Sequence, residues 1–145
     1  MLIANKQINQ AALNTTLIHQ SYSEYAKRFN LNYNELIVLY SLVTQKVCTQ
    51  KQIGAIRELP KQTVHNICRK WIAEGIINVL DNAEDKREKN LTLSKKGQTL
   101  ALPIIEPLLE LEYQSVAEFG DENMHAFIHY FSTLQKIIAK NIGSK

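Results

Sequence analysis

Residues 59–75 read LPKQTVHNICRKWIAEG and have the periodicity of an amphipathic α-helix. The apolar positions recur at i, i+3, i+4, i+7 and i+8, and they are Val64, Ile67, Cys68, Trp71 and Ile72. The opposite face has no carboxylate, and its side chains are those of Lys61, Gln62, His65, Asn66, Arg69 and Lys70. Amides pair with adenine, cations bind phosphate or guanine, and a helix fits the major groove. This face is a candidate nucleic-acid surface, and an ordinary solvated helix face is the alternative.

The composition indicates one compact domain and argues against several classes of protein. The chain has 145 residues, 45% of them hydrophobic, with five Gly and three Pro. No run of 18 apolar residues and no secretory signal is visible, so we expect no membrane span and a cytoplasmic location. The glycines form no phosphate-binding loop or dinucleotide fingerprint, and no Ser/His/Asp grouping is apparent. We therefore expect neither an enzyme nor a required cofactor.

The net charge of +3 is unevenly distributed. Residues 46–96 contain eleven Lys or Arg against six Asp or Glu, a net of +5, and the remainder has six against eight, a net of −2. Residues 101–135 have six carboxylates and no Lys or Arg. The middle of the chain is therefore the part expected to bind nucleic acid.

Two helices are predicted before the central basic segment. Apolar residues spaced by threes and fours predict a long helix over about residues 8–29. Asn32 and Glu35 then form a capping-box pattern, which predicts a second helix starting near Tyr33.

A third, short helix completes a helix-turn-helix with the segment quoted first. Thr49 and Gln52 repeat the capping-box pattern. The helix must end before Pro60, because proline disfavours α geometry in the residue before it and is comfortable in the first turn of the next helix. The sequence therefore predicts two helices joined by a tight turn, the second of which is the recognition helix.

A β-hairpin is predicted directly after the recognition helix. Gly75 is a plausible left-handed helix terminator. Residues 76–80 are rich in β-branched side chains, residues 81–90 form a charged loop, and residues 91–93 alternate again. A hairpin in this place is the wing of a winged helix.

The tip of this wing carries a second set of candidate DNA contacts. Asp85 and Arg87 are two residues apart, so the carboxylate is expected to orient the guanidinium for entry into the minor groove. Lys86 and Lys89 flank this pair as expected phosphate contacts. A solvated charged turn is the alternative.

Two further helices follow the wing. Ser94 is expected to cap a helix that reaches about Phe119, with a kink or a locally broken ladder where Pro103 and Pro107 fall inside it. Asp121 is expected to cap the last helix. The first and the last two helices are more apolar than one winged helix requires, so we expect a homodimer whose symmetry matches a palindromic DNA site.

The chain resembles the multiple-antibiotic-resistance regulator (MarR) family over residues 50–97. QIGAIRELPKQTVHNICRKWIAEGII, residues 52–77, is similar to the helix-turn-helix of that family, and DNAEDKREKNLTLSKKG, residues 81–97, is similar to its Asp-x-Arg wing. The chain departs from the family pattern at Pro60, where a Ser cap is usual, at Val79, where a basic residue is common, and at Lys86, where a second Arg is usual.

This resemblance implies a mainly α protein with a small β wing, in which N- and C-terminal helices form a homodimer. Residues 1–30 and 98–145 would be dimerisation helices, and residues 31–97 the DNA-binding lobe of one intertwined unit. The implied function is a ligand-responsive repressor that binds a pseudo-palindromic operator in double-stranded DNA. The implied major-groove contacts are Lys61, Gln62, Thr63, His65, Asn66 and Arg69, and Arg87 would enter the minor groove beside Asp85.

Some residues could serve an effector. The resemblance implies that a small lipophilic or phenolic ligand binds at the junction of the first two helices. The aromatic residues that gather there are more often plain core than pocket, and they are Tyr22, Tyr25, Phe29, Tyr33 and Tyr40. Glu122, His125 and His129 fall at i, i+3 and i+7 of the last helix, a spacing that can converge on one metal ion. They are weak candidates, because a position at the interface or in solvent is favoured. A cysteine redox switch is not favoured, because it needs an exposed thiol of low pKa. Cys68 belongs to the buried face, and Cys48, in a linker, is the better of the two candidates.

An alternative function is a winged-helix module that binds a protein partner without specific DNA binding. Such a module would carry acidic or exposed apolar residues on its recognition helix. In the segment quoted first, Glu74 is the one acid near the end of the helix, which counts against this alternative.

Overall fold

The computed structural model describes residues 1–143, and its fold is the winged helix-turn-helix predicted from the sequence. The elements occur in the order α1 (Leu2–Lys27), α2 (Tyr33–Gln45), β1 (Cys48–Thr49), α3 (Gln50–Ala55), α4 (Lys61–Ala73), β2 (Ile77–Asp81), β3 (Lys89–Leu93), α5 (Lys95–Phe119) and α6 (Asp121–Gly143). The chain forms two compact units, the first from Met1 to Ile105 and the second starting at Glu106. Each unit is described separately below. None of the helices in the described residues is long and apolar enough to cross a membrane.

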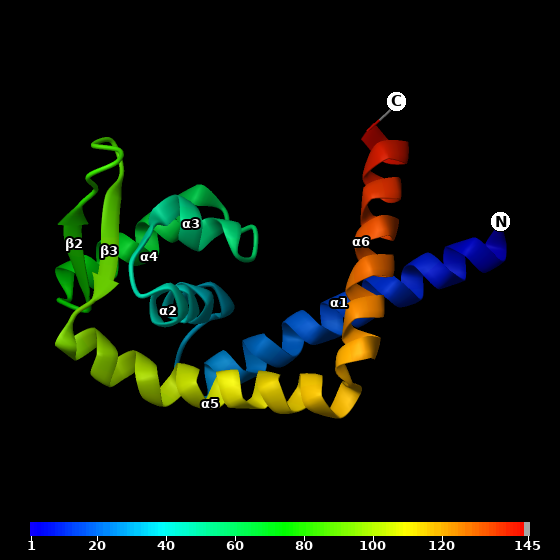
Figure 1. The fold of residues 1–145 in the computed structure, drawn as a ribbon, viewed down its shortest axis with the longest axis horizontal. Helices are drawn as coiled ribbons and strands as arrows, with labels where there is room; N and C mark the ends of the chain where they lie inside the picture. The colour runs from blue at the N-terminus through cyan, green and yellow to red at the C-terminus, as the bar shows by residue number, and fades with distance from the viewer. Residues whose placement is uncertain (144–145) are drawn as a thin grey trace. The chain divides into compact units, whose positions relative to one another are not determined.

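Helix α2 is the centre of the first unit. In Figure 1 it lies among α1, the α3–α4 pair and the sheet, and it contacts each of them. Four consecutive residues, Leu36 to Leu39, are fully buried, so α2 is enclosed on more than one side. The predicted capping box is confirmed, because Asn32 Oδ1 accepts from the Glu35 amide at 2.9 Å and Glu35 Oε2 accepts from the Asn32 amide at 3.0 Å.

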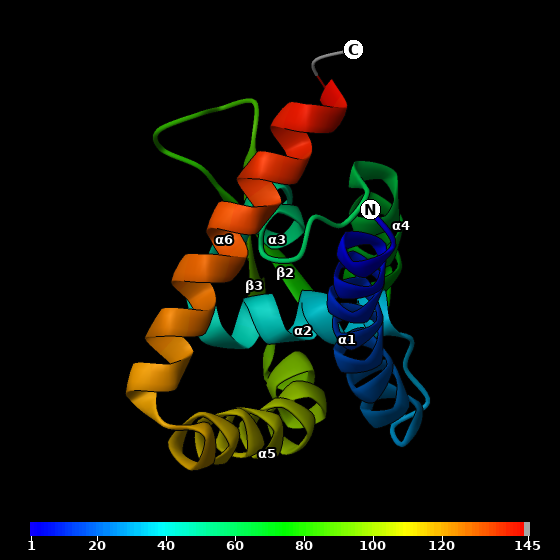
Figure 2. The ribbon, with the colours of Figure 1, turned by 90° about the vertical axis from the view of Figure 1, so that its right-hand side faces the viewer.

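Helix α1 is longer at its start than predicted and ends close to the predicted place. It begins at Leu2 instead of about Ile8 and ends at Lys27. Residues 2–7 contain neither Gly nor Pro, so nothing in their sequence breaks the helix. Near its end, Tyr25 and Ala26 are buried, and Tyr25 Oη donates to the carbonyl of Ile104 at 2.7 Å. This bond joins α1 to the part of α5 that belongs to the first unit. Figure 2 shows α1 in front of the other helices of this unit.

The helix-turn-helix is formed by α3 and α4. The capping box of α3 is confirmed by reciprocal bonds between Thr49 and Gln52, at 2.8 and 3.2 Å. Helix α4 buries Val64, Ile67, Cys68 and Trp71, as the periodicity predicted. Ile72 was wrongly assigned to this buried face, because it is 36% exposed. Its position lies at the edge of the apolar arc, where the helix turns toward solvent.

The sheet has three strands, one more than the predicted hairpin. β2 and β3 pair antiparallel with Ile77 opposite Leu93, and β1 pairs with the other edge of β3, with Cys48 opposite Leu91. The segment around Cys48, interpreted from the sequence as a linker, is therefore part of the sheet. Gly75, at φ +73°, allows the turn from α4 into β2, as predicted.

Helix α5 runs from Lys95 to Phe119, so Pro103 and Pro107 do not end it. Because proline has no backbone N–H, each of the two removes one hydrogen bond from the helical ladder, as the expected local break requires. Ser94 Oγ accepts from the Gly97 amide at 3.0 Å, which confirms the predicted cap. In the second unit, α5 ends at Phe119 and is followed by Gly120, whose φ is +93°. Gly120 precedes α6, and Asp121 is the first helical residue instead of the cap.

Candidate nucleic-acid interface

The exposed face of α4 carries the side chains predicted to enter a major groove. Lys61, Gln62, His65, Asn66 and Arg69 are exposed, and Thr63 is half-buried. Gln62 Nε2 donates to Asn66 Oδ1 at 2.9 Å, one helical turn away, which holds the two amides side by side. Within α4 the exposed face has cations and amides and no acidic side chain. The helix therefore offers hydrogen-bond donors and acceptors for base edges together with charge for phosphate.

The start of α4 leaves backbone donors available. Pro60 is the N-cap and provides no side-chain hydrogen bond, and the first helical bond runs from the Val64 amide to the Pro60 carbonyl at 3.1 Å. The amides of residues 61–63 therefore have no partner within the helix. The positive end of the helix dipole lies at the same place and favours an anion.

Lys70 differs from the other cations of α4. Its Nζ lies 3.3 Å from Glu35 Oε1, in an ion pair that joins the last turn of α4 to the first turn of α2. The sequence predicted Lys70 on the polar face of α4, but this ion pair holds its amino group against α2. Lys70 is therefore the least available of the predicted contacts on α4.

At the tip of the wing, Asp85 acts on the backbone of Arg87. Asp85 Oδ1 accepts a hydrogen bond from the Arg87 amide at 2.9 Å, whereas no ion pair between their side chains occurs in the described residues. Asn82 Oδ1 accepts from the amides of Glu84 and Asp85, so the tip is a sequence of side-chain-capped turns. The prediction that the Asp85 carboxylate orients the Arg87 guanidinium directly is therefore wrong. The carboxylate instead holds the backbone of the loop that carries Arg87.

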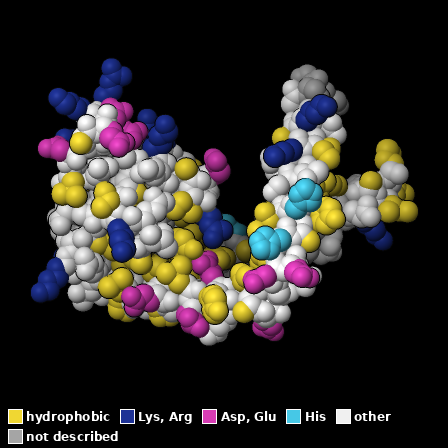
Figure 3. Space-filling model, viewed as in Figure 1, with side chains coloured by type: hydrophobic (Ala, Val, Ile, Leu, Met, Phe, Trp, Pro, Cys, Tyr) yellow, Lys and Arg dark blue, Asp and Glu magenta, His cyan; other side chains and the backbone are white. Residues whose placement is uncertain are grey.

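The other wing lysines occupy different surroundings. Lys86 is exposed at the tip, whereas Lys89 Nζ lies 2.6 Å from Asp81 Oδ1 across the hairpin. The hydrogen bond and the charge of Lys89 lower the pKa of Asp81. Figure 3 shows basic and acidic side chains together at the end of the hairpin. The tip is thus a mixed-charge surface with Lys86 and Arg87 as its unpaired cations among the described residues.

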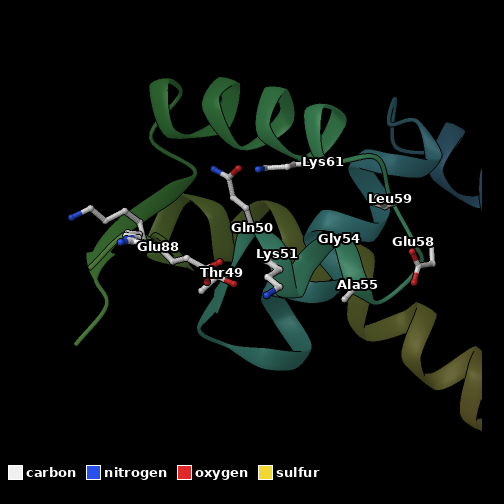
Figure 4. Close-up of a pocket in the computed structure, with 11 residues that line it drawn as sticks. Thr49, Gln50, Lys51, Gly54, Ala55, Glu58, Leu59, Lys61 and Glu88 are labelled. Carbon is white, nitrogen blue, oxygen red and sulfur yellow. The ribbon is translucent and has the colours of Figure 1, made fainter. Parts of the chain in front are cut away.

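A cavity of about 680 Å³ lies between the helix-turn-helix and the wing. Gln50 and Lys51 of α3 line it, together with Lys61 of α4 (Figure 4). Arg87 of the wing also lines it. The sequence analysis did not select Gln50 or Lys51. Their place directly after the capping Thr49 was an available signal, because it puts them on the helix that precedes the recognition helix.

The two cysteines are both structural. Cys48 is 1% exposed in β1 and Cys68 is fully buried in α4. Burial raises the pKa of Cys48 to about 11 and that of Cys68 to about 12, with a smaller contribution from the nearby Cys48. A redox role for Cys48 would require an exposed thiol of low pKa, so its burial and raised pKa argue against that alternative. The pairing of β1 with β3, which the sequence analysis missed, is what buries Cys48.

The aromatic residues near the junction of α1 and α2 have separate partners. Tyr25 is buried, with its pKa raised by burial, and its ring lies 5.3 Å from that of Phe29. The Arg57 guanidinium stacks over Tyr22 at 5.2 Å, and Tyr33 contacts His19 at 3.9 Å between ring centroids. Tyr40 is half-buried. Tyr25 is a core residue, and the effector role of the group stays a prediction.

Glu122, His125 and His129 do not converge on a metal site. Residues 1–143 contain no group of three or more His, Cys, Asp and Glu side chains arranged to hold an ion. All three side chains are exposed on α6, where Figure 3 shows histidines beside hydrophobic residues.

Comparisons with known proteins agree on one family. A model of the MarR family matches residues 29–88. The chain is 33% identical over 125 residues to the uncharacterized HTH-type transcriptional regulator YwoH of Bacillus subtilis, covering 86% of this chain and 88% of that protein. The structure of NMB1585, a MarR family regulator from Neisseria meningitidis, matches with 31% identity and a TM-score of 0.83, over 95% of this chain and 97% of that one. Reduced AbfR bound to DNA matches with 25% identity and a TM-score of 0.68, over 95% and 96% of the two chains.

Proposed function

The chain belongs to the MarR family of helix-turn-helix transcriptional regulators, and from that premise we propose that it binds a specific operator in double-stranded DNA as a homodimer. In this proposal α4 enters the major groove and the wing enters the adjacent minor groove. The observation that carries it is the composition of the exposed face of α4, which has cations, amides and an imidazole but no carboxylate. The related AbfR has been solved on DNA, which supports the same use of the fold here.

Specific binding is tested by selection from a random pool of duplex DNA with the purified protein, followed by titration of the best duplex at several salt concentrations. We expect enrichment of a pseudo-palindrome whose half-sites lie about one helical turn apart, with a steep salt dependence. A pool that is not enriched, with weak binding that only follows ionic strength, would contradict specific recognition and favour a module that binds a protein partner.

The homodimer is supported by apolar side chains that each unit leaves exposed. On α1 these are Leu2, Ile3, Ile8, Leu13, Leu17 and Ile18. On α6 no described residue is buried, and its exposed apolar residues are Phe127, Ile128, Phe131, Ile137 and Ile142. Surfaces of this kind favour association with a second copy, in which apolar area is removed from water. Light scattering on the purified chain is expected to give the mass of two copies, and a monomer at micromolar concentration would contradict this.

We also propose that the regulator is a repressor whose DNA binding is weakened by a small phenolic or lipophilic ligand. The half-buried aromatic residues Tyr22, Tyr33 and Tyr40 near α1 and α2 support this site. Phenolic acids such as salicylate, added to the selected DNA complex, are expected to release DNA at concentrations that leave the fold intact by circular dichroism. Release that is unchanged when Tyr33 is replaced by Ala would locate the ligand elsewhere.

A further inference from the structure

The cavity between the helix-turn-helix and the wing has an excess of positive charge. Its lining includes the cations Lys51, Lys61, Arg87 and Lys89, against the carboxylates Glu58 and Glu88. Figure 4 shows Lys61 and Glu88 on different sides of the cavity, with Gln50 and Lys51 of α3 between them. The cavity therefore has basic groups from three separate elements: α3, α4 and the wing.

When a winged helix binds DNA, one phosphodiester strand passes between the recognition helix and the wing. The major and minor grooves of a duplex are separated by a phosphodiester strand. A protein that places α4 in one groove and the wing tip in the next must therefore accommodate that strand between them. Lys61 is at the start of α4 and Arg87 is at the wing tip, and both residues line the cavity. A strand running between the two groove-reading elements would therefore pass this cavity.

Lys51 is the cation that α3 contributes to the cavity, and it is available. It is exposed, and none of the described residues forms an ion pair with its amino group. Lys89, by contrast, is paired with Asp81. The half-buried Gln50, next to Lys51, adds a neutral amide to the same wall.

We propose that Lys51 binds one backbone phosphate of the strand that passes between α4 and the wing, and that it thereby sets the position of the recognition helix along the duplex. This inference rests on the proposed function and assigns a contact outside the two groove-reading elements. Because a phosphate carries no base identity, Lys51 contributes affinity and register without base specificity.

The test pairs the protein variant with a neutralised phosphate. The selected operator is synthesised with a single methylphosphonate at each position between the base pairs covered by α4 and the minor groove covered by the wing. Binding of the wild type and of Lys51→Gln is measured for each duplex. We expect one position at which neutralisation weakens the wild type roughly 10-fold but leaves Lys51→Gln almost unaffected.

The salt dependence provides a second readout. Lys51→Gln is expected to lower the slope of log K against log salt by about one unit, while the ranking of operator variants stays the same. Lys27→Gln is the matched control, because Lys27 is an exposed lysine of α1 that does not line the cavity. It should keep the wild-type slope.

The outcomes separate this inference from the proposed function. If the wild type selects an operator but every methylphosphonate affects wild type and Lys51→Gln equally, the Lys51 contact is overturned and specific DNA binding stands. If the wild type selects no operator, the proposed function itself fails. A reduced slope in Lys27→Gln equal to that in Lys51→Gln would also overturn the contact, because the effect would then be one of net charge.

Discussion

The amide of Arg87 donates a hydrogen bond to Oδ1 of Asp85 at 2.9 Å, so the carboxylate positions the backbone of the wing tip and leaves the guanidinium available. We predict that Arg87→Ala weakens operator binding by about 1–3 kcal/mol and lowers the salt slope by about one unit. Fluorescence anisotropy at several salt concentrations measures both. Asp85→Asn keeps an oxygen acceptor for the same amide and should weaken binding less than Arg87→Ala. If Arg87→Ala binds like the wild type, the wing is not part of the mechanism.

Arg69 and Lys70 are adjacent in the chain but should differ in their effect on DNA binding. Arg69 is exposed on the groove face, whereas Lys70 is held 3.3 Å from Glu35. We predict a loss of about 1–3 kcal/mol of binding for Arg69→Ala and a clearly smaller loss for Lys70→Ala. Lys70→Ala should cost at most about 1 kcal/mol of folding stability, as for an exposed ion pair. Equal losses of binding for the two variants would show that Lys70 leaves Glu35 to contact DNA.

Gly97, in the first turn of α5, packs against the backbone of Ile76, which lies between α4 and β2. A Cβ on Gly97 would lie 2.1 Å from the carbonyl oxygen of Ile76, which is backbone and cannot rotate away. We predict that Gly97→Ala destabilises the protein by about 1–3 kcal/mol or more, measured by urea unfolding. Gly54→Ala is the control, because its Cβ would meet ordinary contacts at 3.5 Å or more and alanine favours the helix. Similar unfolding midpoints for the two variants would contradict this packing argument.

The buried thiols predict a loss of stability at alkaline pH. Folding raises the pKa of Cys48 and Cys68 from about 9 to about 11 and about 12. Between these values the unfolded chain loses thiol protons that the folded chain retains, so their contribution to stability is complete below about pH 9 and declines as the pH rises above it. Urea midpoints at pH 8 and pH 10 should fall more in the wild type than in a Cys48→Ala/Cys68→Ala variant. An equal fall in both proteins would contradict burial of the thiols.

The sequence predicted the parts of the fold that depend on local patterns. The two capping boxes and the buried face of α4 follow from residues within one or a few helical turns of one another, and the hairpin follows from the single continuous segment 76–93. The two-residue strand β1 did not follow, because its existence depends on pairing with β3 some forty residues later and not on any local periodicity. The burial of Cys48 was missed for the same reason.

In the candidate site, too, the features set by local sequence could be predicted and those set by tertiary packing could not. The exposed face of α4 could be predicted from its period, but the pairing of Lys70 with Glu35 joins residues 35 positions apart and is set by the packing of α2 on α4. Likewise, the two-residue spacing predicted an interaction between Asp85 and Arg87. Whether the Asp85 carboxylate accepts from the Arg87 amide or from its guanidinium depends on the backbone conformation of the turn. The position of Gln50 and Lys51 on the first helix of the helix-turn-helix could be predicted from the sequence. That they line one cavity with Arg87 could not, because this depends on the packing of the wing beside α3.

Thr49 belongs to two structures at once, because it pairs with Asn90 in the sheet and caps α3 with its side chain. The wing and the helix-turn-helix therefore share a residue. If the wing separated from β1, α3 would lose its cap, so we expect these elements to open as one cooperative unit in hydrogen exchange. We therefore expect the spacing between the wing tip and the recognition helix to be set before DNA binds.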